Sequence, residues 1–165
     1  MNIIRSISSN ELRFIATVTY SSMAAHVLHI SSKKIRNTCR KIAINYFVNN
    51  LLNEYLNSND YYLFLKNIHK ALSLIYKKHF PDYSFGLSAK WTNLIIKYLA
   101  IAGVVDKNDI HCPVDSIVIR DAGLHYKWSI IGENEYKIII QIIKNKCTGS
   151  NLFEYELDVW NSNRP

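Results

Sequence analysis

The sequence is poor in glycine, proline and cysteine, with five, three and three of them among 165 residues. The cysteines Cys39, Cys112 and Cys147 are widely spaced and form no Cys-x-x-Cys pair, which argues against a disulfide framework and a zinc knuckle. A His-x-x-x-His pair is also missing from the sequence, so we expect no metal and no cofactor. A reducing, cytoplasmic location fits this use of cysteine best.

Long apolar runs are missing as well. Asn10, Glu11 and Arg13 interrupt the N-terminal segment, so it contains no continuous hydrophobic stretch. No other segment approaches the roughly 18 apolar residues that a membrane-spanning helix needs. The most apolar run, residues 94–105, contains Lys97 and is typical of a core helix. We therefore expect no membrane partner.

Positive charge exceeds negative charge, and the net charge is +7. Residues 1–100 hold 13 basic and 4 acidic side chains, whereas residues 101–165 hold 7 and 9. An anionic partner such as DNA would explain the excess in the first part. An A/T-rich gene is the alternative explanation, because Lys, Asn, Ile and Tyr together make up 65 residues.

The apolar pattern predicts an all-α fold, a compact single-domain helical bundle over residues 1–165. Ser8 and Glu11 have the spacing of a capping box at the start of a first helix. Ser32 can cap a helix that ends near Asn57, and Asn59 can cap another over about 60–79.

Further helices are expected in the second half of the chain. One covers 87–102 and would end at Gly103 in the left-handed conformation, and a short one would begin at Pro113. Segment 130–146 is rich in isoleucine and also suits a buried strand, although its length and acidic start favour a helix. The last helix, 152–160, would pack three side chains on the core: Phe153, Leu157 and Trp160.

The second predicted helix carries a coherent basic face. Five cations fall within nine residues: Lys33, Lys34, Arg36, Arg40 and Lys41. At about 100° per residue they cover about 160° of the helix, opposite its apolar side. Such a face can bind phosphates and release counterions, or it can be an ordinary solvated surface.

The helix predicted over 87–102 is apolar except for a narrow stripe of Lys90, Asn93 and Lys97. A polar stripe on so apolar a helix faces either water or a polar cavity. If it faces a cavity, the candidate lining residues are Asn93, His111 and Trp91. Lys97 would add a second cation for nucleic acid.

Two segments resemble the core of the helix-hairpin-helix DNA glycosylases: Gly86-Leu-Ser-Ala-Lys90, which leads a helix, and Pro113-Val-Asp115. In that superfamily a glycine hairpin binds backbone phosphate, a lysine is the nucleophile of the bifunctional members, and an aspartate assists. The resemblance covers about residues 83–120. It implies a phosphate-binding role for Gly86, a nucleophilic role for Lys90 and an assisting role for Asp115.

The same residues are similar to an uncharacterised bacterial protein family with a Lys-Trp-x-Asn helix and a His-x-Pro-x-Asp segment. Asp115 also has a purely structural interpretation, as a helix cap that accepts from the amide of Cys112. Trp128 and Trp160 could stack bases, line an oligomer interface or belong to the core.

The chemistry of the resemblance requires an amine that burial or a neighbouring cation, here Lys97, has freed of its proton. This amine would attack C1′ of an extruded nucleotide, and the carboxylate would stabilise the cationic sugar. The sequence therefore favours a basic, helical, nucleic-acid-binding protein of glycosylase or lyase type. The alternative is a non-enzymatic helical homo-oligomer with a pocket for a small anionic ligand.

Overall fold

The computed structural model describes residues 1–24, 30, 32–147 and 150–163. These residues form helices and turns without a strand, which confirms the prediction of a compact all-α fold. The elements are α1 (Ser9–Ala24), α2 (Lys33–Asn57), α3 (Tyr61–Tyr76), α4 (Phe85–Ile101), η1 (Lys107–Asp109), α5 (Ser116–Asp121), η2 (Trp128–Ile130), α6 (Glu133–Lys146) and α7 (Leu152–Ser162).

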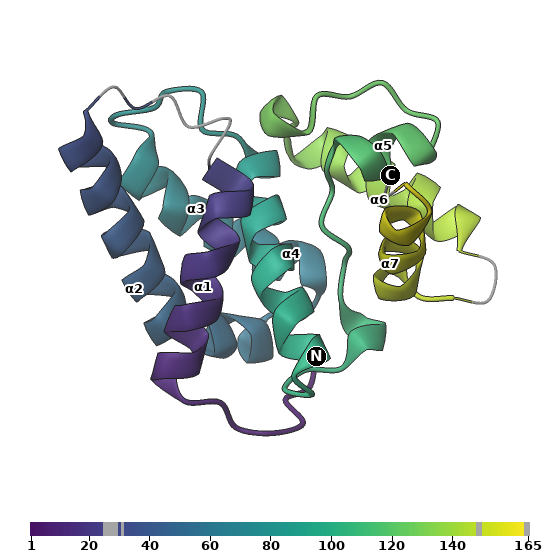
Figure 1. The fold of residues 1–165 in the computed structure, drawn as a ribbon, viewed down its shortest axis with the longest axis horizontal. Helices are drawn as coiled ribbons and strands as arrows, with labels where there is room; N and C mark the ends of the chain where they lie inside the picture. The colour runs from purple at the N-terminus through teal and green to yellow at the C-terminus, as the bar shows by residue number, and fades with distance from the viewer. Residues whose placement is uncertain (25–29, 31, 148–149, 164–165) are drawn as a thin grey trace.

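Four long helices form the N-terminal part of the fold. Helix α1 packs against α2 and α4, and α3 packs against the same two helices from the other side. The shorter helices α5, α6 and α7 gather beside α4, at the right of Figure 1. An extended segment from η1 to α5 connects the four long helices to the three shorter ones. Helix α4 lies between the two groups, because it contacts α1 and α3 on one side and α6 on the other.

The first two helices begin at the polar residues that the sequence suggested. Ser8 and Glu11 cap each other's backbone, since the Ser8 amide donates to Glu11 Oε2 (2.9 Å) and the Glu11 amide donates to Ser8 Oγ (3.2 Å). The predicted cap of α2 is confirmed as well, because Ser32 accepts from the amide of Ile35. The prediction for α3 was wrong by one residue, because Asp60 and not Asn59 accepts from the first turn.

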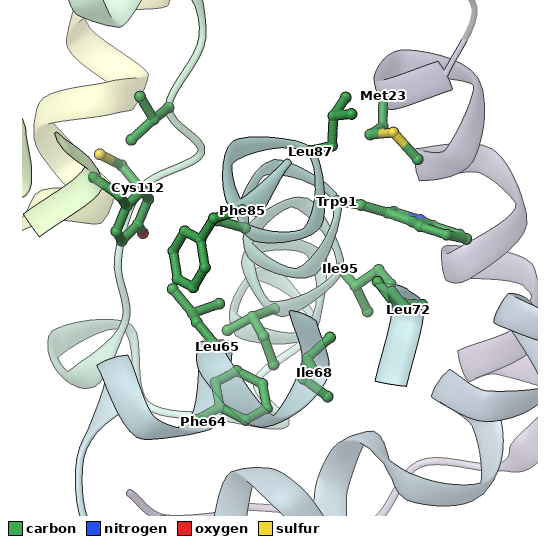
Figure 2. Packing of buried hydrophobic residues seen from close by; sticks show 14 of the residues in the cluster. Met23, Phe64, Leu65, Ile68, Leu72, Phe85, Leu87, Trp91, Ile95 and Cys112 are labelled. Atoms are coloured by element: carbon green, nitrogen blue, oxygen red, sulfur yellow. The ribbon is translucent and has the colours of Figure 1, made fainter. Parts of the chain in front are cut away.

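Helix α4 is the central helix of the fold. It begins two residues earlier than expected, because the Ser84 side chain accepts from the amide of Leu87. Gly103 follows its last turn with φ of 70°, the left-handed conformation that glycine adopts without strain. Figure 2 shows α4 end-on, with Trp91 and Ile95 on the side of α1 and α3 and Phe85 nearer to the loop that carries Cys112.

Helix, and not strand, is confirmed for the isoleucine-rich segment that forms α6. Its four buried side chains lie at helical spacing: Tyr136, Ile139, Ile140 and Ile143. The expected helix start at Pro113 was wrong, because Pro113 lies in the extended segment and α5 begins only after Asp115.

The expected core face of α7 is confirmed only for Phe153, which packs against the core cluster. Phe153, Leu157 and Trp160 are only partly buried, and the buried side chains are Leu152, Glu156 and Val159. The helix is therefore rotated so that a carboxylate points inward. A polar partner on α4 explains this orientation, as described below.

Candidate functional site

Two cavities adjoin at Lys90. The first, of about 380 Å³, lies between α4, α5 and α7 and is lined by Lys90, Lys97, Asp115 and Glu156, among others. The second, of about 700 Å³, is lined by Lys90 and by residues 125–129, which precede α6. Ser22 and Ser116 also line both cavities, so the two cavities meet at these serines and Lys90.

Lys90 is half-buried on the second turn of α4. Its Nζ lies 3.9 Å from the centroid of the Trp128 ring, a cation–π contact. Burial lowers the pKa of the Lys90 ammonium, and the negative charge of Asp115 opposes this effect. A lysine with a lowered pKa has a larger neutral fraction near pH 7, and the neutral amine is the nucleophilic form.

Asp115 is the N-cap of α5 and lines the first cavity with Lys90. Its Oδ1 accepts from the amides of Ile117 (3.0 Å) and Val118 (3.1 Å). The prediction that Asp115 caps a helix is thus confirmed. The predicted donor was wrong, because the capping amides belong to Ile117 and Val118 and not to Cys112. Both of these hydrogen bonds go to a single carboxylate oxygen, so capping uses only part of the acceptor capacity of Asp115.

Lys97 does not carry a free positive charge into the first cavity. Its Nζ forms an ion pair with Glu156 Oε2, and the side chains of Lys97 and Glu156 are only 15% and 2% exposed. Burial raises the pKa of the Glu156 carboxyl, and the paired ammonium opposes this effect. The sequence analysis missed Glu156, although this acid lies four residues after Leu152 and three before Val159, on the same side of α7.

Asn93 lies on α4 between the two lysines but does not share their cavities. It is fully buried, accepts from Tyr61 Oη (3.0 Å) and donates to the Cys112 carbonyl (3.0 Å) and Tyr136 Oη (2.9 Å). The expected polar stripe is therefore divided, because two tyrosines satisfy Asn93 inside the core.

His111 belongs to the same buried network. Its Nδ1 lies 3.2 Å from Tyr136 Oη, and its ring centroid lies 4.4 Å from that of Tyr61. Burial lowers the pKa of His111 to about 3, with a smaller contribution from Lys144. His111 lines a separate cavity with Tyr61 and Tyr62, so it does not extend the site around Lys90.

Trp91, expected in a pocket, is part of the core. Its side chain is fully buried, its ring contacts Tyr20 and Phe47 edge-on, and its Nε1 donates to Thr19 Oγ1 (3.2 Å). An aromatic cluster from α1 and α2 therefore occupies the space around Trp91, because helical spacing puts Trp91 on the opposite side of α4 from Asn93.

Gly86 does not offer its amide to a ligand. The amide donates to the carbonyl of Ile131 (3.0 Å), and the residue is buried. A Cβ atom at position 86 would lie 2.0 Å from the carbonyl oxygen of Trp128, so only glycine permits this approach. The expected phosphate-binding role is thus replaced by a packing role, which brings Trp128 close to the start of α4.

The basic face of α2 is divided in two. Lys33, Lys34 and Lys41 are exposed and line a shallow cavity of about 580 Å³. Arg36 and Arg40 are partly buried, and the Arg40 guanidinium lies 4.9 Å from the Tyr20 ring centroid. The cavity that these exposed lysines line shares no residue with the two cavities at Lys90.

The described residues contain no group of three His, Cys, Asp or Glu side chains that could hold a metal ion. Within the same residues, no helix combines the length and the apolar composition required to cross a bilayer. The chemistry that the first cavity offers is that of the Lys90 amine beside the Asp115 carboxylate, since Glu156 is paired with Lys97.

Comparison with known proteins gives no assignment for the chain: no protein-family model, no curated protein and no solved structure matches it.

Proposed function

We propose that this protein acts on nucleic acid, with Lys90 as an amine nucleophile in a glycosylase- or lyase-type reaction at C1′ of an extruded nucleotide. The observation that carries the proposal is that Lys90 and Asp115, from separate elements, line one cavity. A lysine whose pKa is lowered by burial and a carboxylate beside it are the two groups that this chemistry requires.

In the proposed step, the neutral Nζ of Lys90 forms a bond to C1′ while the glycosidic bond breaks. The electron pair of that bond leaves with the base, which takes up a proton from water. The sugar ring then opens, with a proton passing to O4′ and an iminium remaining between Nζ and C1′. Asp115 stabilises the positive charge that develops on the sugar and accepts the proton that Nζ releases.

The second cavity suits the rest of such a nucleotide. Tyr126 and Trp128 supply aromatic surfaces on which a base can stack, and His125 and Lys127 lie on the same wall. Lys127 is exposed and can meet a backbone phosphate. The exposed lysines of α2 would contact DNA further from the site, as a separate electrostatic surface.

The test is borohydride trapping on a duplex with an abasic site, since an abasic sugar requires no knowledge of the base. The aldehyde and the amine of Lys90 form an iminium with loss of water, and borohydride reduces the iminium to a stable amine. We expect a covalent adduct with the wild-type protein and with Lys70→Gln, an exposed lysine of α3, but none with Lys90→Gln.

An adduct that persists in Lys90→Gln would mean indiscriminate reaction of surface lysines and would overturn the role of Lys90. A folded wild-type protein that forms no adduct would overturn the lyase reaction as well. That result would favour the non-enzymatic module with an anionic ligand, which thermal-shift screening with small anions then addresses.

A further inference from the structure

The ion pair of Lys97 and Glu156 forms one wall of the cavity that contains Lys90 and Asp115. Glu156 reaches this wall from α7, and Lys97 lies seven residues after Lys90 on α4. Both side chains are largely removed from water. The proposed reaction assigns neither of them a role, although burying two charges is costly unless they are paired.

A helix rises 1.5 Å per residue, so Lys90 and Lys97 are separated by about 10 Å along α4. One unit charge at that distance shifts the pKa of a partly buried amine by roughly one unit. An uncompensated Lys97 would therefore release the proton of Lys90 at a distinctly lower pH. A paired Lys97 has little effect on Lys90, because the opposite charge of Glu156 lies beside it.

We infer that Glu156 is a positioning residue that acts through Lys97: by neutralising the Lys97 ammonium, it sets the pH at which Lys90 loses its proton. The functional meaning of this inference rests on the proposed nucleophilic role of Lys90. The coupling between the three charges is a property of the protein alone and requires no substrate.

Other charged or titratable groups face the same three side chains. Asp115, at the start of α5, lines the same cavity as Lys90 and Glu156 and acts on the pKa of both, and the charge of Glu156 contributes to the raised pKa of Cys112 in the extended segment. His125 and Lys127 line the second cavity beside Lys90. All four stay in place in the variants below, so they contribute equally to each titration.

The experiment measures the titration of Lys90 without DNA. The protein is labelled briefly with acetic anhydride between pH 6 and pH 11, and peptide mass spectrometry gives the labelling rate of Lys90 at each pH. We expect Glu156→Gln, which keeps the size of the side chain, to lower the midpoint by about one pH unit. The double variant Lys97→Met, Glu156→Gln removes both charges and should return the midpoint to the wild-type value.

An unchanged midpoint in folded Glu156→Gln would overturn the inference, and so would a double variant that shifts as far as the single one. Circular dichroism shows whether Glu156→Gln folds. If it does not fold, the labelling midpoint of Lys90 in the Lys97→Met variant tests the inference instead. It leaves the Glu156 charge uncompensated and should raise the midpoint, whereas no change or a lower midpoint would contradict the coupling.

The same variants separate the inference from the proposed function. If the expected shifts occur but the wild-type protein forms no adduct with an abasic duplex, the lyase reaction is wrong and the coupling stands. If the adduct forms with its pH midpoint unmoved in Glu156→Gln, the coupling is wrong and the nucleophilic role of Lys90 stands.

Discussion

The ammonium of Lys90 lies over the ring of Trp128, 3.9 Å from its centroid, and joins α4 to the turn that precedes α6. A half-buried cation–π contact of this kind contributes about 0.5–1 kcal/mol or more to stability. We expect a double-mutant cycle of Lys90→Met and Trp128→Leu, measured by urea denaturation, to give a coupling energy in this range. Lys70→Met combined with Trp128→Leu is the control, and its effects should add, because Lys70 lies on the exposed side of α3.

Asp115 offers a way to separate capping from chemistry. Asn caps helices about as well as Asp, so Asp115→Asn should change the free energy of unfolding by less than about 0.5 kcal/mol. Asp115→Ala removes the cap and should cost about 1 kcal/mol. If the carboxylate assists Lys90, both variants should slow abasic-site trapping by at least tenfold. Trapping that slows only in Asp115→Ala would show that Asp115 acts as a cap alone.

Gly86 should tolerate no side chain, against the usual rule for helices. Gly→Ala inside a helix normally stabilises a protein by about 1 kcal/mol. At position 86 the new methyl group would meet the Trp128 carbonyl, so we expect Gly86→Ala to destabilise by about 2 kcal/mol or more. Gly103→Ala, which has open space but a positive φ, should cost only about 1 kcal/mol in the same thermal or urea unfolding experiment.

The buried His111 should make the protein acid-sensitive. Its pKa is about 3 in the folded state and near 6.5 when unfolded, so only the unfolded state takes up the proton between these values. The free energy of unfolding is therefore unaffected by the titration of His111 above pH 6.5. It decreases as the pH falls below that value, by about 2 kcal/mol between pH 7 and pH 5. His69, whose pKa burial also lowers, acts in the same direction.

The measurement for His111 is the slope of unfolding free energy against pH. Whatever the stability of His111→Gln at pH 7, its slope between pH 7 and pH 5 should be shallower than that of the wild-type protein. Equal slopes for the two proteins would mean that His111 is protonated in the folded state.

The exposed lysines of α2 are proposed to contact DNA phosphates away from the cavities at Lys90. If they bind DNA phosphates, changing Lys33, Lys34 and Lys41 to Gln should weaken binding uniformly across sequences. The slope of log K against log salt should fall by about one for each phosphate that the variant no longer neutralises. Lys107→Gln, at a lysine paired with Glu154, is the control. An unchanged slope would remove α2 from any DNA-binding surface.

The helix boundaries were largely predictable because capping is local. Ser8 and Glu11, or Ser32 and Ile35, are three residues apart, so the sequence contains both members of each hydrogen bond. The errors at Asp60 and Pro113 arose where several capping residues or a proline stand close together. In such segments several residues can start the helix, and the spacing in the sequence does not rank them.

The site was less predictable, because its partners lie far apart in the chain. Lys97 and Glu156 are separated by 59 residues, and the packing of α7 against α5 and η1 brings Glu156 to Lys97 of α4. Nothing in the sequence marks Tyr61 and Tyr136 as hydrogen-bond partners of Asn93. Without visible partners, Asn93 was predicted to face a cavity. Hydropathy predicts which positions are buried, but it does not show which buried polar groups satisfy one another.

The distribution of tryptophan has a practical consequence for spectroscopy. Trp128 lines one of the cavities beside Lys90 and Trp160 lines the other, whereas Trp91 is sealed in the core. The intrinsic fluorescence of the protein therefore combines two indoles at the site with one that senses only the integrity of the fold. A ligand that enters either cavity alters the emission of a neighbouring indole, so occupancy can be followed without a label.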